Sequence, residues 1–375
     1  MGFTSVELYN FRNLKSGKID TSYTTVYLVG ENGQGKTNLL EAVYLLCFGS
    51  SFRTKNQRLL IRYGEKEMSL RGTFSPADGE DGAGLGREAF DMELRLFTAA
   101  GAGKRKEIYV DGKRVQDRKE LIRNVPCIVF SHDDIEFING TPERKRWFLN
   151  QTMSMFNPLF IDTLRKYNRL VKMRNTELKE QSGAGLDIYD SQLAELGLEI
   201  VRLREKTVSE FNETFMEMYR IMQGGNDSDP VRIVYAPSWK GADTAAEVCR
   251  ILAERRETDR EAGFTTSGPH RDRLVFTYRG RDFAQTASTG QLRLISLVLR
   301  SAQTRFFHEK AGREPVLLLD DVLLELDTER KRAFMEAMPA YEQAFFTFLP
   351  DEQFRKMYEG EETKVYTVEN GEISE

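Results

Sequence analysis

The segment from Gly30 to Thr37, which reads GENGQGKT, has the residue types and spacing of a phosphate-binding loop. It follows a short apolar run, Val26–Val29, and leads into the apolar residues of a helix. In this setting glycines let backbone N–H groups converge on phosphate oxygens, and the helix N-terminus adds positive potential. We expect the Lys36 ammonium to bind the β- and γ-phosphates of a nucleotide and the Thr37 hydroxyl to ligate Mg²⁺. The predicted nucleotide contacts are Gly30, Glu31, Asn32, Gly33, Gln34, Gly35, Lys36, Thr37 and Asn38.

Two adjacent carboxylates, Asp320 and Asp321, follow the apolar run Val316–Leu319. Beside a phosphate loop, the first carboxylate after such a strand holds Mg²⁺, directly or through water. Asp320 is therefore predicted as a metal ligand together with Thr37. Asp321 is predicted as the general base or water-orienting group, and with Lys36 it forms the predicted catalytic pair. Taken alone, the run would be a buried strand ending in an acidic turn, which is common, so its weight comes from the loop upstream.

Most of the chain separates Lys36 from Asp320, whereas small P-loop kinases and GTPases place these groups closer together. The guanine-reading motif N-K-x-D is also absent. A long insertion between the two halves of the site is typical of ABC-type ATPase heads.

The segment Ser288-Thr289-Gly290-Gln291 precedes a helical run and resembles a shortened ABC signature. In such signatures Ser and Gly at a helix N-terminus bind the γ-phosphate of ATP held by another subunit. Ser288, Gly290 and Gln291 are therefore predicted to contact nucleotide in trans. Alone, the segment would be read as a helix cap, and its order after the loop favours the signature. Leu324–Asp327 then stands where such ATPases carry the D-loop.

Short apolar segments at both ends of the chain supply the strands that must position these groups. The sequence predicts strands at Thr4–Asn10, Glu93–Phe97 and Cys127–Phe130, and again at Ala344–Phe348. The dipeptide Asp111-Gly112 predicts a hairpin turn.

The middle of the chain has helical periodicity instead. Thr141-Pro142 predicts a capped helix start, and the apolar spacing predicts one helix to about Lys179. After a break at 182–185, a second helix extends past Phe215, forming an antiparallel hairpin with arms of about 35 residues, or about 50 Å each. A third helix is predicted over Thr244–Ala262.

The predicted architecture is an α/β ATPase head of the ABC type, split by a mostly helical arm. The head comprises residues 1–140 and 263–375, and the helical insertion comprises residues 141–262. Two domains are also the number expected for a chain of 375 residues at roughly 150 residues per domain.

Composition excludes several classes of protein. The chain is 40% hydrophobic and 30% charged, which supports a packed core and excludes wholesale disorder. A formal net charge of −4 excludes a histone-like polycation but not local basic patches. No apolar run of about 20 residues and no secretory signal pattern is present, so we expect a cytoplasmic protein without a membrane partner.

The sequence closely resembles the RecF family of bacterial recombination mediators over essentially its whole length. The matching motifs are Asn10-Phe11-Arg12-Asn13-Leu14, the phosphate loop extended to Glu41-Ala42, Ser51-Phe52-Arg53-Thr54, Phe130-Ser131 with Asp133-Asp134-Ile135, Gly268-Pro269-His270-Arg271-Asp272, and Leu318-Leu319-Asp320-Asp321-Val322. The related SMC-type heads carry far longer coiled coils. Two positions depart from the family: His132 replaces a usual proline, and Phe346-Thr347-Phe348 lacks a switch histidine.

The resemblance implies an ATP- and Mg²⁺-dependent DNA-binding protein of DNA repair, replication and the SOS response, associated with the nucleoid. It implies a homodimer that forms on ATP, clamps double-stranded DNA near gaps, and works with RecR and RecO to load RecA. It also implies a weak, DNA-modulated ATPase whose slow hydrolysis resets the clamp.

Basic clusters are the candidate DNA contacts. They are Lys104, Arg105 and Lys106; Arg144, Lys145 and Arg146; and Arg165, Lys166 and Arg169, a series continued by Lys172 and Arg174. Such clusters are as often solvated helix faces, but in a dimer they would contact phosphates without reading bases. Arg12 is predicted to contact nucleotide, and Arg53 to contact DNA or couple it to the ATP site.

Three alternatives remain open from the sequence. A transporter ATPase subunit should carry a signature closer to L-S-G-G-Q and a membrane partner. A scaffold that binds ATP without hydrolysing it would release no phosphate. A metal-dependent nuclease is disfavoured, because no further cluster of carboxylates or histidines is present.

Overall fold

The computed structural model describes residues 2–76, 88–99, 103–180, 185–223, 230–324, 326–350 and 360–375, without the side chains of 98, 99, 103 and 104. The chain divides into two compact units. The first comprises Met1–His132 with Phe307–Glu375, and the second comprises Asp133–Phe306. The predicted insertion, 141–262, lies inside the second unit. The second unit begins earlier in the sequence and ends later than this prediction, so it also includes the signature segment.

A largely parallel six-stranded sheet forms one half of the first unit. Three of its interior strands, Thr25–Val29, Val316–Leu319 and Gln343–Phe348, are buried along their whole length, as expected for strands covered on both faces. The phosphate loop follows one of these strands, and Asp320 follows another that is parallel to it, so both groups lie at the same edge of the sheet. In spatial order the strands are β15 (Glu372–Ser374), β14 (Thr363–Glu369), β3 (Thr25–Val29), β13 (Gln343–Phe348), β12 (Val316–Leu319) and β8 (Cys127–Phe130).

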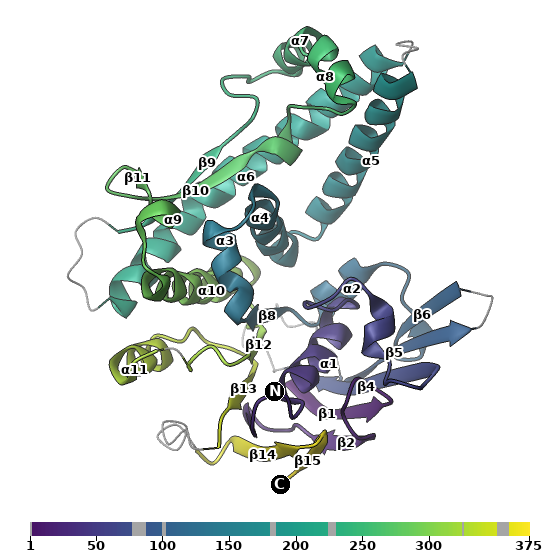
Figure 1. Ribbon diagram of the computed structural model, residues 1–375, viewed down its shortest axis with the longest axis vertical. Coiled ribbons are helices and arrows are strands. Elements are labelled where there is room, and N and C mark those ends of the chain that lie inside the picture. The colour runs from purple at the N-terminus through teal and green to yellow at the C-terminus, as the bar shows by residue number, and fades with distance from the viewer. Residues whose placement is uncertain are drawn as a thin grey trace. The chain divides into compact units, whose positions relative to one another are not determined.

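An antiparallel six-stranded sheet forms the other half of the first unit (Figure 1). Asp111 and Gly112 join two of its strands with positive φ angles of 49° and 69°, which confirms the predicted hairpin turn. In spatial order the strands are β2 (Gly17–Asp20), β1 (Gly2–Tyr9), β4 (Glu67–Ser75), β5 (Phe90–Ala99), β6 (Gly103–Val110) and β7 (Lys113–Arg114).

Helix α1 (Lys36–Phe48) packs against strands of both sheets. Its sequence, KTNLLEAVYLLCF, is apolar on nearly every side after the first turn, so the helix is buried in the core of the unit. The remaining elements of this unit are η1 (Gln57–Leu60), α2 (Arg118–Asn124) and α11 (Thr328–Glu336).

The second unit is mostly helical and contains one small antiparallel sheet, ordered β11-β10-β9. Helix α10 begins in this unit and ends in the first. No described helix is long and apolar enough to cross a membrane. The elements are η2 (His132–Ile135), α3 (Glu136–Asn139), α4 (Pro142–Phe156), α5 (Leu159–Glu180), α6 (Leu186–Met222), β9 (Arg232–Ala236), α7 (Ala245–Glu254), α8 (Arg256–Ala262), η3 (Pro269–Arg271), β10 (Arg273–Tyr278), β11 (Arg281–Asp282), α9 (Phe283–Thr286) and α10 (Thr289–Ala311).

Two helix predictions for this unit are wrong in detail. The helix expected from Thr141 to Lys179 is interrupted at Asn157-Pro158, because proline lacks an N–H and restricts the residue before it. The helix expected over Thr244–Ala262 is divided at Arg255 into α7 and α8. The start at Thr141 is confirmed, since its side chain accepts a hydrogen bond from the Arg144 N–H. Residues 182–184 of the predicted break lie outside the described residues.

Helices α5 and α6 pack against each other as the predicted hairpin. With 37 residues, α6 has the predicted arm length, whereas α5 has 22 residues because of the break before it.

Candidate nucleotide-binding site

The Lys36 side chain lies inside the phosphate loop. Its ammonium donates hydrogen bonds to the carbonyl oxygens of Gly30 at 2.7 Å and Glu31 at 3.1 Å. The side chain is buried, so the cation is held in one place by the loop backbone rather than by solvent. This geometry presents a positive charge at the N-terminus of α1, where phosphate oxygens are favoured.

The glycines of the loop are required by close approaches. Gly35 has a φ of 125°, and a Cβ atom there would lie 2.7 Å from Leu14 Cδ2. At Gly30 a Cβ atom would lie 2.3 Å from the Val368 carbonyl oxygen. The loop is therefore packed tightly between the segment before β2 and the C-terminal strands.

Two segments distant in sequence anchor the loop backbone. The Gly371 N–H donates to the Gln34 carbonyl oxygen at 3.0 Å, and the Asn370 N–H donates to Gln34 Oε1 at 2.6 Å. Asn13 Nδ2 donates to the carbonyl oxygen of Gln34 at 3.3 Å. The sequence alone does not reveal the role of residues 370–371. Asn-Gly is a recognisable turn signal, but it does not say what the turn contacts.

The carboxyl end of β12 meets the phosphate loop at Asp320. The Thr37 hydroxyl donates to Asp320 Oδ1 at 2.7 Å. Burial raises the pKa of Asp320 to about 6; the Thr37 hydrogen bond opposes this shift and the neighbouring Asp321 carboxylate adds to it. A hydroxyl and a buried carboxylate in contact are hard oxygen donors of the kind that Mg²⁺ prefers, and a cation beside them would favour ionised Asp320. The residues present therefore fit a magnesium ion.

Asp321 is held by Thr347 on the neighbouring strand β13. The Asp321 N–H donates to Thr347 Oγ1 at 2.7 Å, and the Thr347 hydroxyl donates to Asp321 Oδ1 at 2.8 Å. Asp321 has a φ of 51°, a conformation that few residues other than glycine, asparagine and aspartate adopt. In the sequence, Thr347 stands out only because it is not a histidine. The signal for its role is a single hydroxyl in the buried run Gln343–Phe348.

Arg12 and Arg53 meet at a fully buried carboxylate, Glu41, on α1. Arg12 makes two hydrogen bonds to Glu41, each 2.8 Å long, and the Ser51 hydroxyl makes another. One guanidinium nitrogen of Arg53 lies 3.7 Å from Glu41 Oε2. The family motifs around residues 10–14, 41 and 51–54 thus form one cluster. The role of Glu41 was missed, because a glutamate inside an apolar helix gives no signal about its partners.

A chain of hydrogen bonds connects Arg53 to the phosphate loop through Asn38. Arg53 donates to Asn38 Oδ1 at 2.7 Å, and Asn38 Nδ2 donates to Asn13 Oδ1 at 2.6 Å. Asn13 in turn bonds the loop carbonyls. Arg53 is therefore positioned to sense the loop, although the partners of Arg12 and Arg53 in this structure are protein groups.

The signature segment forms a reciprocal helix cap in the second unit. The Gln291 N–H donates to Ser288 Oγ at 3.3 Å, and the Ser288 N–H donates to Gln291 Oε1 at 2.8 Å. These bonds form a capping box at the start of α10. Ser288, Gly290 and Gln291 are all exposed. Of the predicted D-loop, Glu325 lies outside the described residues, and Asp327 caps α11 by accepting from the Arg330 N–H at 2.8 Å.

The basic clusters predicted to contact DNA lie on β6, on α5 and at the start of α4. In β6, Arg105 pairs with Glu107 at 2.6 Å, whereas Lys106 donates to the Gly49 carbonyl oxygen at 2.7 Å. The side chain of Lys104 is outside the described part of the structure. Arg165 lies 3.5 Å from Asp162, and Lys166 and Arg169 are exposed on α5.

The cluster at the start of α4 is engaged within the protein. Arg144 pairs with Glu136 at 2.7 Å and lies over the ring of Phe137. Arg146 donates to the Asp272 carbonyl oxygen at 2.8 Å. Burial lowers the pKa of Lys145.

The assignment of Arg174 to a DNA-binding face is wrong. Its side chain is fully buried and hydrogen-bonds Asp190 and Asp259, each at 2.6 Å. Arg174 therefore joins α5, α6 and α8 rather than facing solvent.

Comparisons with known proteins find relatives along nearly the whole chain. The family model described as RecF/RecN/SMC N terminal domain matches residues 3–374. The "DNA replication and repair protein RecF" of Treponema pallidum (strain Nichols) is 42% identical over 366 residues, covering 98% of this chain and 99% of that protein. The protein of the same name from Symbiobacterium thermophilum is 32% identical over 356 residues, covering 92% and 91%.

Two solved structures resemble this one in fold. One is described as the recombination mediator protein RecF-ATP in the RecFOR pathway, with a TM-score of 0.87, 27% identity, and coverage of 100% of this chain and 97% of that chain. An Smc head bound to the C-winged helix domain of ScpA has a TM-score of 0.57 at 15% identity, covering 99% and 96%, which shows the fold alone. The predicted fold class, an α/β head of the SMC and RecF type, is confirmed.

Proposed function

Because the chain belongs to the RecF family of DNA replication and repair proteins, we propose that it is an ATPase that binds double-stranded DNA in its ATP-bound state. The observation that carries the proposal is the 2.7 Å hydrogen bond from the Thr37 hydroxyl to Asp320. It joins the phosphate loop to the carboxylate at the end of β12, as an ATP-hydrolysing site requires.

The phosphate loop would hold the nucleotide through its backbone N–H groups and Lys36. Lys36 would exchange the carbonyl oxygens of Gly30 and Glu31 for phosphate oxygens, which attract an ammonium more strongly because they are charged. Thr37 and Asp320 would hold Mg²⁺, which when bound neutralises charge on the β- and γ-phosphates.

Asp321 is proposed to orient and deprotonate the attacking water. The water oxygen forms a bond to the γ-phosphorus, the bond to the bridging oxygen of ADP breaks, and the proton passes to Asp321. Thr347 holds one carboxylate oxygen, which leaves the other for water. An aspartate reaches less far than the glutamate of many ABC heads, which agrees with slow turnover.

A second copy of the chain is proposed to complete the site. Its exposed signature segment would place the Ser288 hydroxyl and the Gly290 N–H against the γ-phosphate, with Gln291 capping the same helix turn. Because these groups come from a partner subunit, dimerisation would depend on ATP. The dimer would clamp DNA near single-strand gaps and act with RecR and RecO to load RecA, and hydrolysis would reopen it.

DNA contacts are proposed at basic side chains that the fold leaves exposed or only lightly engaged. In the first unit these are Lys106 and Arg53, which also hydrogen-bond Gly49 and Asn38, and in the second unit they are the exposed Lys166 and Arg169. The residues Arg105, Arg144, Lys145, Arg146 and Arg165 remain candidates with protein groups close by. Contacts of this kind carry no base information, so binding should be independent of sequence and weakened by salt.

The proposal is tested by fluorescence anisotropy of a labelled DNA duplex with ATP and Mg²⁺ and without nucleotide, at two salt concentrations. Strong ATP-dependent binding that weakens with salt supports it. Absence of binding in both states removes DNA as the direct ligand and favours a scaffold. Release of phosphate from ATP separates an ATPase from a scaffold that only binds the nucleotide.

A further inference from the structure

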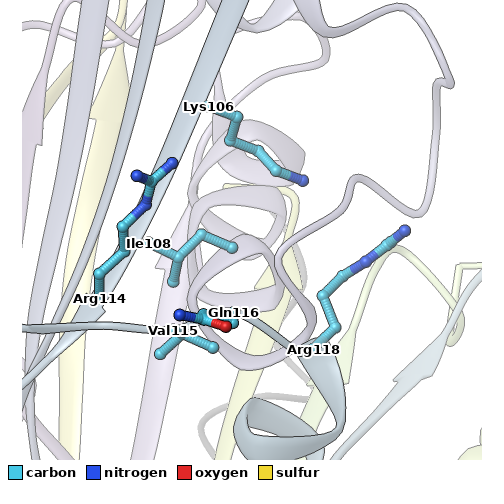
Figure 2. Close-up of a pocket in the computed structure, with 6 residues that line it drawn as sticks. All are labelled: Lys106, Ile108, Arg114, Val115, Gln116 and Arg118. Atoms are coloured by element: carbon cyan, nitrogen blue, oxygen red, sulfur yellow. The ribbon is translucent and has the colours of Figure 1, made fainter.

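A basic pocket lies in the first unit, away from the phosphate loop. It has a volume of about 470 Å³ and is bordered by β6, β7 and the start of α2 (Figure 2). Its lining residues are Lys106, Ile108, Arg114, Val115, Gln116 and Arg118. Three of the six are cationic and none is acidic, so the pocket is a local concentration of positive charge.

The two arginines are available to a ligand. Among the residues that the structure describes, Arg114 and Arg118 have no carboxylate at ion-pair distance. Asp117, which lies between them in the sequence, caps α2 by accepting from the Lys119 N–H at 3.1 Å. An unpaired arginine fork beside a hollow is suited to an anion that accepts two hydrogen bonds at once.

Lys106 and Arg118 converge on one backbone position, Gly49, at the C-terminus of α1. Lys106 donates to the Gly49 carbonyl oxygen at 2.7 Å. Gly49 has a φ of 64°, and a Cβ atom there would lie 2.7 Å from Ile108 Cδ1 and 3.4 Å from Arg118 Cδ. A side chain at position 49 would clash with Ile108, so glycine lets β6 pack closely against the helix end that Lys106 contacts.

The charged side chains of β6 lie on two faces of the strand, and only one of these faces borders the pocket. Successive side chains of a strand point to opposite faces, so Lys106 and Ile108 face α1 and α2, whereas Arg105 and Glu107 face the other side and pair there. The opposite face of the sheet carries Arg71 and Arg95, both paired with Glu93. Among the described residues, Lys106 and Arg118 thus have no carboxylate partner on this face, and Arg114 of the edge strand β7, which pairs with Tyr109, lines the pocket from the edge of the sheet.

We propose that this pocket binds a phosphate group of a DNA strand, an assignment that rests on the proposed function. Lys106, Arg114 and Arg118 contact the phosphate oxygens. Ile108 and Val115 form an apolar floor against which the adjoining sugar packs, which a free inorganic anion would not use. Because Gly49 ends the helix that Lys36 begins, a phosphate that draws Lys106 from the Gly49 carbonyl also acts on the helix of the ATP site.

The test is the salt dependence of duplex binding with ATP and Mg²⁺ for a variant carrying Lys106→Gln, Arg114→Gln and Arg118→Gln. The affinity of this variant should fall by about tenfold or more, and its salt slope should become shallower by about 1 for each DNA phosphate that it no longer binds. The single variant Lys106→Arg, which keeps the charge, should retain most of the affinity. Unchanged thermal unfolding of the triple variant establishes that it is folded.

The matched control removes three positive charges from the other face of the same sheet, by Lys18→Gln, Arg71→Gln and Arg95→Gln. It should bind duplex as the wild type does, so an equal loss in both triple variants would mean a general charge effect and overturn the proposal. Wild-type affinity in the pocket variant would overturn it as well, while leaving the proposed function standing. Absence of duplex binding by the wild type would instead remove the proposed function and this assignment with it.

A calorimetric titration with inorganic pyrophosphate, on protein already saturated with ATP analogue and Mg²⁺, distinguishes the source of the phosphate. Pyrophosphate binding that the pocket variant lacks, together with unchanged duplex binding, would assign the pocket to a free anion and overturn the DNA assignment. Loss of duplex binding in the pocket variant is the result expected.

Discussion

The Thr347 hydroxyl is hydrogen-bonded to two atoms of Asp321, accepting from its N–H at 2.7 Å and donating to its Oδ1 at 2.8 Å. One side chain on β13 thus fixes both the backbone and the carboxylate of the residue that follows Asp320. Asp321 has a left-handed φ of 51°, so the carboxylate direction depends on a backbone conformation that most residues avoid. Strand β13 thus supplies the hydroxyl that positions the proposed base.

Thr347→Val should therefore slow ATP hydrolysis while leaving ATP binding intact. Loss of both hydrogen bonds frees the Asp321 carboxylate, and a misplaced general base costs up to about 10²–10⁴-fold in rate. We expect a fall of at least about tenfold in phosphate release. Thr347→Ser, which keeps the hydroxyl, should retain most of the rate. Equal rates in the two variants would mean that the hydroxyl does not position Asp321.

Asp321→Asn should bind ATP normally and accumulate as an ATP-bound dimer. Asparagine tolerates the same left-handed φ and has the same size, so the backbone should be preserved, but the amide does not accept a proton from water. Light scattering with ATP and Mg²⁺ measures the dimer, and phosphate release measures turnover. Normal hydrolysis by this variant would show that Asp321 is not the base.

How much of this site could be predicted depends on how local each contact is. Lys36, Thr37 and Asp320 were found because a loop between a strand and a helix, and a carboxylate after a strand, have signatures in a few consecutive letters. Parallel strands of one sheet then bring the two ends together. Thr347, Glu41 and Asn370 were not found, because their partners are distant in sequence and depend on strand order.

The helical part of the fold shows the same limit. Periodicity identified α5 and α6 and their apolar faces, but it did not weigh Pro158, which separates α4 from α5. Periodicity also placed Arg174 with exposed basic residues. Arg174 instead faces Asp190 and Asp259. The periodicity of one helix does not reveal buried carboxylates on two other helices.

Arg174→Met should destabilise the protein rather than alter its salt-dependent DNA binding. Removing Arg174 leaves the buried Asp259 carboxylate without its ion pair and leaves Asp190 with Arg256 alone, which costs about 3–5 kcal/mol of unfolding free energy. Urea denaturation measures the change. Arg169→Met, on the exposed side of the same helix, should stay within about 0.5 kcal/mol of the wild type. Similar stability of the two variants would contradict the buried network.

His270 should make the second unit acid-sensitive. Burial lowers the pKa of His270 to about 4, and its ring nitrogens meet the Tyr167 hydroxyl at 2.9 Å and the Thr265 carbonyl oxygen at 3.0 Å. The folded-state pKa lies below the unfolded value near 6.5, so folding excludes a proton that the unfolded chain binds, and stability is lost as pH falls from about 6.5 to 4. The loss between pH 7.5 and pH 5 should be about 2 kcal/mol. His270→Gln should show less of this dependence by urea denaturation, whereas His308→Gln should show the wild-type dependence. An unchanged slope in His270→Gln would assign acid sensitivity elsewhere.

Ser288 has two proposed roles that different substitutions separate. Its oxygen caps α10 by accepting from the Gln291 N–H, and its hydroxyl is proposed to meet the γ-phosphate of ATP held by a partner subunit. Ser288→Asp keeps an oxygen that can cap the helix, since aspartate is as good a cap as serine, but it places a carboxylate against the phosphate. This variant should keep its stability and bind ATP as a monomer, yet fail to dimerise in light scattering with ATP and Mg²⁺. Ser288→Ala should lose about 1 kcal/mol of stability from the cap and should dimerise less. Ser288→Thr, which keeps the hydroxyl, should match the wild type in both stability and dimerisation. An ATP-dependent dimer of Ser288→Asp as stable as the wild-type dimer would restrict Ser288 to its structural role.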